Sequence, residues 1–110
     1  MKLPNSHLAV VDLRKLTEYC LNPRHEEGRH KARVFMSALG VGQMDATWLH
    51  DRILEAVATC EAQEQLVSPY GRRYIVDFVV VKEGRPASVR TAWIIKRDEV
   101  MPRLTSCFVL

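Results

Sequence analysis

Hydrophobic residues in the first part of the chain recur at helical spacing. Leu13, Leu16 and Cys20 follow Asp12 with the i, i+3, i+7 spacing of an amphipathic helix, and aspartate is a favoured N-cap. The pair Asn22-Pro23 predicts the end of this helix, because the residue before a proline disfavours helical backbone. We therefore expect a first helix that begins after Asp12.

Two more helices are predicted within the first sixty residues. Polar residues 24–28 precede a second helix, which Gly40 should end. The third helix begins after Asp45 and carries its charged residues off the apolar face. The expected apolar stripes are Ala32, Phe35, Met36 and Leu39 on the second helix, and Leu49, Ile53, Ala56, Val57 and Cys60 on the third.

After Gln63 the hydrophobic period changes from 3.6 to 2, which predicts strands. Strands are expected over residues 72–81, 87–96 and 103–110, with 63–67 as a possible short edge strand. Tyr70-Gly71 indicates a turn or bulge, and residues 82–86 a hairpin connection of the longer kind. The expected faces are Tyr74, Val76, Phe78 and Val80 on the first strand; Val89, Thr91, Trp93 and Ile95 against Ser88, Arg90, Ala92 and Ile94 on the second; and Arg103, Thr105 and Cys107 against Leu104, Ser106, Phe108 and Leu110 on the last.

This order of elements predicts an α+β fold. Three N-terminal helices should pack on one side of a three- to four-stranded antiparallel sheet. We expect one antiparallel sheet in chain order, with Phe35, Leu39, Leu49, Ile53 and Val57 buried against Tyr74, Val76 and Phe78 or against the alternate residues of that strand. Both alternations are partly apolar, so the sequence leaves the covered face open.

Length and composition fit a single domain over residues 1–110. Hydrophobic residues make up 47% and charged residues 26% of the 110 residues, as in ordinary globular proteins. The longest apolar run, 78–81, is far too short for a membrane span, and the N-terminus lacks a secretory signal. We expect a cytoplasmic protein, unless the domain belongs to a longer exported one.

Cysteine and histidine spacing predicts no cofactor and no metal site. Cys20, Cys60 and Cys107 are widely spaced and form no CxxC pair, so buried or half-buried free thiols are expected. The four histidines lack metal-ligand spacing, and no HExxH motif or phosphate-binding loop occurs. The net charge of +3 suits a phosphate-bearing partner, but a solvated surface explains it equally well.

Basic residues crowd the start of the second predicted helix. His30 could act as a general acid or base there, because imidazole titrates near neutral pH. Arg29, Lys31 and Arg33 could hold a phosphate, helped by the backbone donors of the helix N-terminus. The alternative is a solvated helix start with surface ion pairs to Glu26 and Glu27.

Two predicted strands carry an arginine with a hydroxyl residue. Arg90 and Thr91 lie in the middle of the second strand and point to opposite faces, and Arg103 and Thr105 lie on the last. Cations and hydroxyls could stabilise a charged phosphorane during RNA cleavage. A cross-strand pair with Asp77 would equally explain Arg90, and threonine is a common strand former.

Several motifs resemble a family of small bacterial domains of unknown function. They are Asn22-Pro23, residues 28–35, Leu39-Gly40, Tyr70-Gly71, residues 74–78, residues 90–93 and residues 102–104. Members of this family occur alone or at the C-termini of toxin-like and phage-associated proteins. The sequence more distantly resembles the barnase, EndoU, colicin and RelE ribonuclease domains, which implies helices before a four-stranded sheet and metal-independent RNA cleavage.

These observations support two functional hypotheses. The first is a possible endoribonuclease of the toxin type, which cleaves RNA through attack by the ribose 2′-hydroxyl. Its expected site residues are His30 as base or acid, Lys31, Arg90 and Arg103 on the phosphate, Thr91 or Thr105 to orient it, and Arg29 and Arg33 to bind phosphate. Its expected partners are RNA and a small acidic antitoxin or immunity protein. The second hypothesis is a non-catalytic module, such as an immunity protein, antitoxin or phage-associated adaptor, that docks an acidic protein or nucleic acid.

Overall fold

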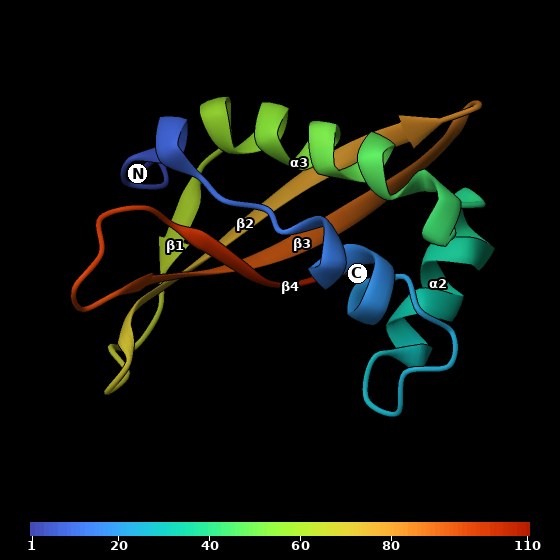
Figure 1. Ribbon diagram of the computed structural model, residues 1–110. Helices are drawn as coiled ribbons and strands as arrows, with labels where there is room; N and C mark the ends of the chain where they lie inside the picture. The colour runs from blue at the N-terminus through green and yellow to red at the C-terminus, as the bar shows by residue number, and fades with distance from the viewer.

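The computed structural model describes residues 1–110 as helices followed by a sheet (Figure 1). The elements are η1 (Ser6–Leu8), α1 (Leu13–Lys15), η2 (Leu16–Cys20), α2 (Arg29–Leu39), η3 (Gln43–Asp45), α3 (Ala46–Thr59), β1 (Ala62–Glu64), β2 (Gly71–Lys82), β3 (Arg85–Lys96) and β4 (Arg103–Val109). The four strands pair antiparallel in chain order, which confirms the predicted α+β fold.

The first predicted helix is present, but its second half is a π-helix. The Asp12 side chain caps α1 by accepting a hydrogen bond from the backbone N–H of Arg14, as expected for an N-cap. In η2 the backbone N–H of Leu21 donates to the carbonyl of Leu16, five residues earlier. Leu16 and Cys20 are consequently both buried, while Tyr19 between them stays half-buried at the surface.

Helices α2 and α3 begin and end close to the predicted residues. Gly40 ends α2 in the left-handed conformation, with φ 66°. The predicted buried residues of both helices are confirmed except Met36, which is exposed, and Cys60, which is half-buried directly after α3. Met36 extends instead toward Gly42, where its methyl group lines a surface pocket beside α2.

The β2–β3 connection is tighter than predicted. Glu83 and Gly84 alone form the turn, with φ values of 50° and 78°, and Lys82 pairs with Arg85 directly beside it. Two successive positive φ values are typical of the type I′ turns that join twisted strands. The sequence signal is weak because glutamate, rather than asparagine or aspartate, occupies the first position.

A β-bulge changes the predicted faces of the last strand. Ala92 pairs with Ser106, whereas the next β3 residue, Trp93, pairs with Leu104, so Thr105 is the extra residue. Leu104 and Cys107 are therefore both buried on the same face. The strict alternation that put Arg103, Thr105 and Cys107 on one face is wrong, because it assumed a continuous ladder.

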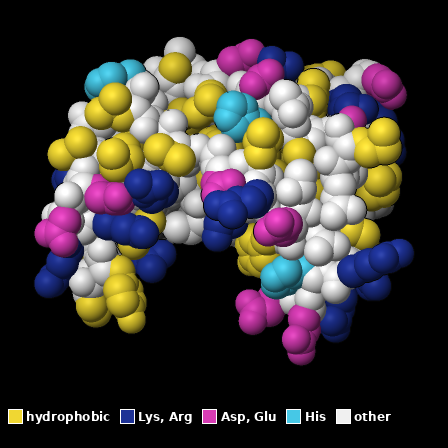
Figure 2. Space-filling view, in the orientation of Figure 1, with side chains coloured by type: hydrophobic (Ala, Val, Ile, Leu, Met, Phe, Trp, Pro, Cys, Tyr) yellow, Lys and Arg dark blue, Asp and Glu magenta, His cyan; other side chains and the backbone are white.

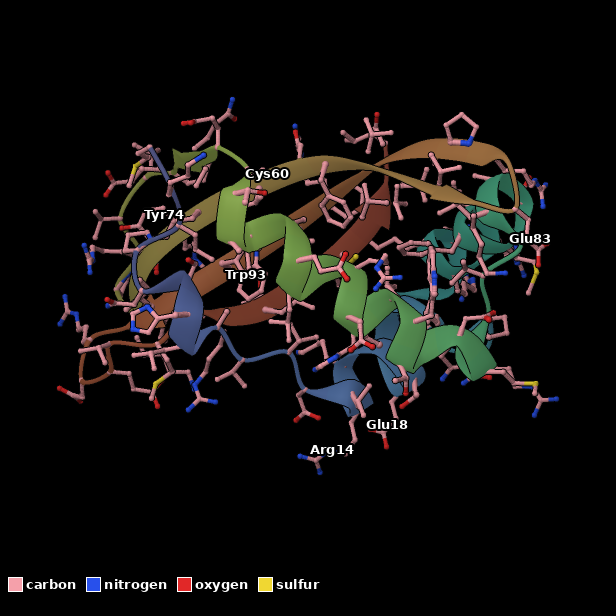
Figure 3. All side chains as sticks on the ribbon, turned by 90° about the horizontal axis from the view of Figure 1, so that it is seen from above. Arg14, Glu18, Cys60, Tyr74, Glu83 and Trp93 are labelled. Atoms are coloured by element: carbon pink, nitrogen blue, oxygen red, sulfur yellow. The ribbon has the colours of Figure 1, made fainter.

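The two faces of the sheet differ in what covers them. Helix α3 crosses one face, and Tyr74 and Trp93 lie on the strands behind it (Figure 3). Twenty-three buried residues from helices and strands form one hydrophobic cluster there, which includes all five predicted helical core residues. The other face is open, and Val79, Val81 and Leu110 on it are 68%, 59% and 59% exposed.

The open face lies in a hollow between two projections (Figure 2). One projection contains the connection between β1 and β2, and the other contains α2 with the preceding loop, residues 22–28 (Figure 1).

The longest helix, α3, has 14 residues, and none of the helices has the length and apolarity to span a membrane.

Candidate functional site

Lys31 on α2 lies at the centre of a polar cluster that joins α2 to the open face of the sheet. Its Nζ donates hydrogen bonds to Tyr19 Oη at 3.0 Å and to Ser106 Oγ at 3.1 Å. The same ammonium group lies 5.3 Å from the Tyr19 ring centre and 5.1 Å from that of Phe108. Lys31 makes no ion pair with a carboxylate, so this half-buried positive charge is not neutralised within the chain.

Tyr19 takes its place in this cluster because of the π-helix and of Gly28. A Cβ atom on Gly28 would lie 2.4 Å from the Tyr19 carbonyl oxygen and 3.0 Å from its ring, so only glycine permits this close approach. Gly28 immediately precedes α2. The contact therefore fixes the start of the helix that carries Lys31 against the turn that carries Tyr19.

His25 lies beside Tyr19 but its ring is already engaged. Its Nδ1 accepts hydrogen bonds from the backbone N–H groups of Glu27 at 3.0 Å and Gly28 at 2.9 Å. Nδ1 is therefore used as an acceptor within the loop. The rings of His25 and Tyr19 meet edge to face with centres 4.9 Å apart. His25 thus shapes the loop, and its Nδ1 is not free to contact a ligand.

Arg90 shares the open face with Phe108, its partner in the β3–β4 ladder. It forms two hydrogen bonds of 2.9 Å with the Asp77 carboxylate on β2, which confirms the cross-strand pair. The Asp77 hydrogen bonds raise the pKa of Arg90 above its usual value. Arg90 thus lies beside Phe108 of the Lys31 cluster, and Asp77 balances the charge of Arg90.

Thr91 lies on the opposite face from Arg90, as predicted, and is fully buried. Its hydroxyl donates to the Val76 carbonyl at 2.7 Å and accepts from Trp93 Nε1 at 2.8 Å. Both hydrogen bonds are internal to the core. The structure therefore does not place Thr91 beside Arg90 or Lys31.

Arg103 pairs with Ile94, two residues along β3 from Ala92, the partner of Ser106, and Thr105 lies in the bulge directly before Ser106. Arg103 forms a bidentate ion pair with Glu99 at 2.8 and 2.9 Å, and these hydrogen bonds lower the pKa of the Glu99 carboxyl. Thr105, the bulge residue, donates to the carbonyl of Ala92 at 3.1 Å. Both residues line a pocket of about 220 Å³ together with Lys15 and Lys96.

His30, Arg29 and Arg33 are exposed on α2. His30 is on the side of the helix opposite the buried stripe of Ala32, Phe35 and Leu39, whereas the adjacent Lys31 flanks that stripe. Arg29 donates to the backbone carbonyl of Glu26, and neither arginine pairs with a carboxylate. Of the predicted α2 residues, the structure brings Lys31 alone to the open face.

Sequence reasoning missed Tyr19, Ser106 and Phe108. Tyr19 sits in a segment that looked like a regular amphipathic helix, and the π-helix that turns it toward Lys31 has no sequence signal. Ser106 and Phe108 were assigned to the face opposite Arg103, because the bulge was not predictable. The spacing of the apolar residues Leu104 and Cys107 was the available hint.

The arrangement is suited to binding an anion. An ammonium group held by two hydroxyls and flanked by two aromatic rings offers charge, donors and stacking surfaces to a phosphate and its base. The Tyr19 oxygen accepts from Lys31, so its own O–H proton remains available for donation. No three His, Cys, Asp or Glu side chains are grouped so that they could hold a metal ion.

The chain matches one described family and is similar to a solved structure. The family described as "Domain of unknown function (DUF6883)" matches residues 2–110. None of the curated proteins matches the sequence. Among solved structures, the chain is similar to a chain of the "Contact-dependent growth inhibition toxin - immunity protein complex from Klebsiella pneumoniae 342", with a TM-score of 0.69 over 92% of this chain and 99% of that chain. Because the identity is 14%, this likeness establishes a shared fold.

Proposed function

The chain belongs to the family described as "Domain of unknown function (DUF6883)", and on that premise we propose that it is a metal-independent ribonuclease of the bacterial toxin type. The observation that carries the proposal is the unneutralised Lys31 ammonium, held by Tyr19 and Ser106 on an open, hollowed face. The similar structure is of a toxin–immunity complex, which agrees with a role in such a system.

In the proposed reaction the ribose 2′-oxygen attacks the adjacent phosphorus and the bond to the 5′-oxygen breaks. The 2′-hydroxyl loses its proton to a base and the 5′-oxygen gains one, so the products are a 2′,3′-cyclic phosphate and a 5′-hydroxyl. Lys31 stabilises the charge on the phosphorane, and Ser106 holds Lys31 in place. Tyr19 protonates the departing oxygen. The assignment of His30 as the base stays a prediction from the sequence, because His30 lies on the exposed side of α2 and not on the open face.

The central test replaces Lys31 with methionine, which keeps a long apolar side chain but removes the charge. We expect kcat for cleavage of an RNA oligonucleotide to fall about a hundredfold or more, as when a single donor to a transition-state anion is lost. Lys82→Met is the matched control, because Lys82 also lies over an aromatic ring, that of Trp48, away from the cluster. A 2′-deoxy substrate should not be cleaved by any variant.

The same assay distinguishes Lys31 from its neighbour. If His30 is the base, His30→Ala lowers kcat with little change in KM. If cleavage depends on His30 while Lys31→Met equals Lys82→Met, the site lies on the exposed side of α2 and the Lys31 assignment is wrong. Absence of RNA cleavage, and of growth arrest when the chain is produced without a partner, would contradict the ribonuclease proposal as a whole.

A second candidate function is a non-catalytic module that docks another protein. The observation that favours it is the exposed apolar end of the open face, formed by Val79, Val81 and Leu110. In the ribonuclease proposal, the same surface and the adjacent cations suit a small acidic antitoxin or immunity protein that covers the site. Replacing Val79 with lysine should then weaken the partner complex without lowering kcat for RNA cleavage. A docking module without catalysis would cleave no RNA in the first place.

A further inference from the structure

A second group of cations lies on the open face, one row along the sheet from the Lys31 cluster. Arg73, Ile94 and Arg103 are adjacent across β2, β3 and β4, and Lys96 follows two residues after Ile94. The pocket of about 220 Å³ at this end has Lys15, Lys96, Arg103, Thr105 and one acidic residue, Asp12, as its polar lining, with Ile94 among its apolar residues. Its polar lining comes mainly from cations.

The charge in this pocket is only partly balanced within the chain. Glu99 pairs with Arg103, and Asp12 pairs with Arg14. Lys15 and Lys96 form no ion pair, although the charge of Lys15 helps to lower the pKa of Asp12 and the charge of Lys96 helps to lower the pKa of Glu99. The cations Arg14, Lys15, Lys96 and Arg103 outnumber the carboxylates Asp12 and Glu99, so the surroundings of the pocket keep a net positive charge that an anion would neutralise.

Lys15 connects this pocket to the Lys31 cluster. Its Nζ lies 5.9 Å from the centre of the Tyr19 ring, over which Lys31 lies at 5.3 Å. The rows that carry Ser106 and Arg103 are opposite Ala92 and Ile94, two residues apart on β3 and so about 7 Å apart. That separation is similar to the step between consecutive phosphates of an extended nucleic-acid strand.

We infer that the pocket lined by Lys15, Lys96 and Arg103 is a second phosphate subsite, which holds the phosphate next to the one at Lys31. The inference rests on the proposed function for its substrate class, which it narrows to single-stranded RNA longer than a dinucleotide. Lys96 and Lys15 neutralise the second phosphate, and Thr105 lies at the edge of the same pocket.

The test measures binding, so that it does not depend on catalysis. The probe is a 2′-O-methyl RNA oligonucleotide, which lacks the attacking hydroxyl, titrated by fluorescence anisotropy over a range of salt concentrations. Lys96→Ala should weaken binding several-fold and reduce the salt slope by about one unit. Arg97→Ala is the matched control, because Arg97 is an adjacent exposed cation without a carboxylate partner and does not line this pocket.

A second probe carries one uncharged methylphosphonate linkage beside the phosphate that is cleaved in the all-ribose substrate. Wild type should bind this probe at least as weakly as Lys96→Ala binds the normal one, because Lys15 loses its phosphate contact as well. Lys96→Ala should bind this probe as well as wild type does, since the contact that it removes is already absent. Arg97→Ala should lose the same small amount with both probes.

Three results would each overturn the subsite. Lys96→Ala and Arg97→Ala could weaken binding equally, the loss from Lys96→Ala could add to the loss from the methylphosphonate linkage, or the protein could fail to bind RNA. Failure of the proposed function looks different: RNA binds with the Lys96-specific loss, but the all-ribose substrate is not cleaved. Cleavage that depends on Lys31, with Lys96 no different from Arg97, would remove the subsite and leave the ribonuclease.

Discussion

At the scale of single residues, neighbouring positions on β3 have different environments. Arg90 lies on the open face with its charge balanced by Asp77, and Thr91 lies in the core with both of its hydrogen-bonding directions used. The hydroxyl of Thr91 satisfies the buried indole N–H of Trp93, which no other group contacts by a hydrogen bond. Thr91 is therefore placed to stabilise the fold.

Thr91→Val tests this placement, because valine keeps the shape and removes the hydroxyl. We expect the free energy of unfolding to fall by about 1–3 kcal/mol, since the Trp93 N–H and the Val76 carbonyl would be left without their partner. Urea denaturation measures the loss. Turnover per folded molecule should stay within about twofold, and a hundredfold lower kcat in a folded variant would instead place Thr91 in the reaction.

At the scale of elements, the site depends on how η2 and α2 pack together. Gly28 allows the start of α2 to approach the backbone of Tyr19, and the two elements then bring Lys31 and Tyr19 within 3.0 Å. Neither element alone contains the cluster. A change at their contact should therefore affect stability and site geometry together.

Gly28→Ala should lower the free energy of unfolding by about 1–3 kcal/mol, because the new methyl group would overlap the backbone oxygen of Tyr19. Cleavage should also fall, since α2 moves relative to η2. Gly42→Ala is the control: its Cβ would meet only the end of the flexible Met36 side chain, at 2.9 Å. Thermal unfolding and kcat are measured for both variants, and equal behaviour would show that the Gly28 contact is dispensable.

At the scale of the whole molecule, two buried thiols lie where the helical half meets the sheet. Burial raises the pKa of Cys20 from 9.0 to about 11, and burial also raises the pKa of Cys107. Cys60 is a free thiol that is only half-buried. A raised thiol pKa means that the folded state binds the proton more tightly than the unfolded state.

The contribution of Cys20 to stability should therefore be complete below pH 9 and lost as pH rises from 9 to about 11. For Cys20 alone the loss is at most about 3 kcal/mol, because each tenfold change in proton affinity corresponds to about 1.4 kcal/mol. Urea unfolding between these pH values should show a smaller decline for Cys20→Ala than for wild type. Cys60→Ala keeps both buried thiols and should follow the wild-type decline; parallel curves for all three proteins would contradict the assignment.

The sequence by itself determined the order of the elements, but it left open which face of the sheet the helices cover, because both alternations of the first long strand are partly apolar. Residues such as Phe35, Leu49 and Ile53 recur at helical spacing and Tyr74, Val76 and Phe78 at strand spacing, and each must be buried whatever its neighbours are. The cap at Asp12 and the stop at Gly40 also follow from local chemistry.

The tertiary structure alone decided which polar residues meet. The π-helix at Tyr19 and the bulge at Thr105 are each a one-residue departure from a regular ladder, and each turns the following side chains to a different face. Their free energy comes from packing between distant segments, so the local sequence gives no sign of the π-helix and only the odd spacing of Leu104 and Cys107 as a sign of the bulge. Lys31 was predicted as a site residue on an exposed helix, but its contacts with Tyr19 and Ser106 exist only because both departures occur together.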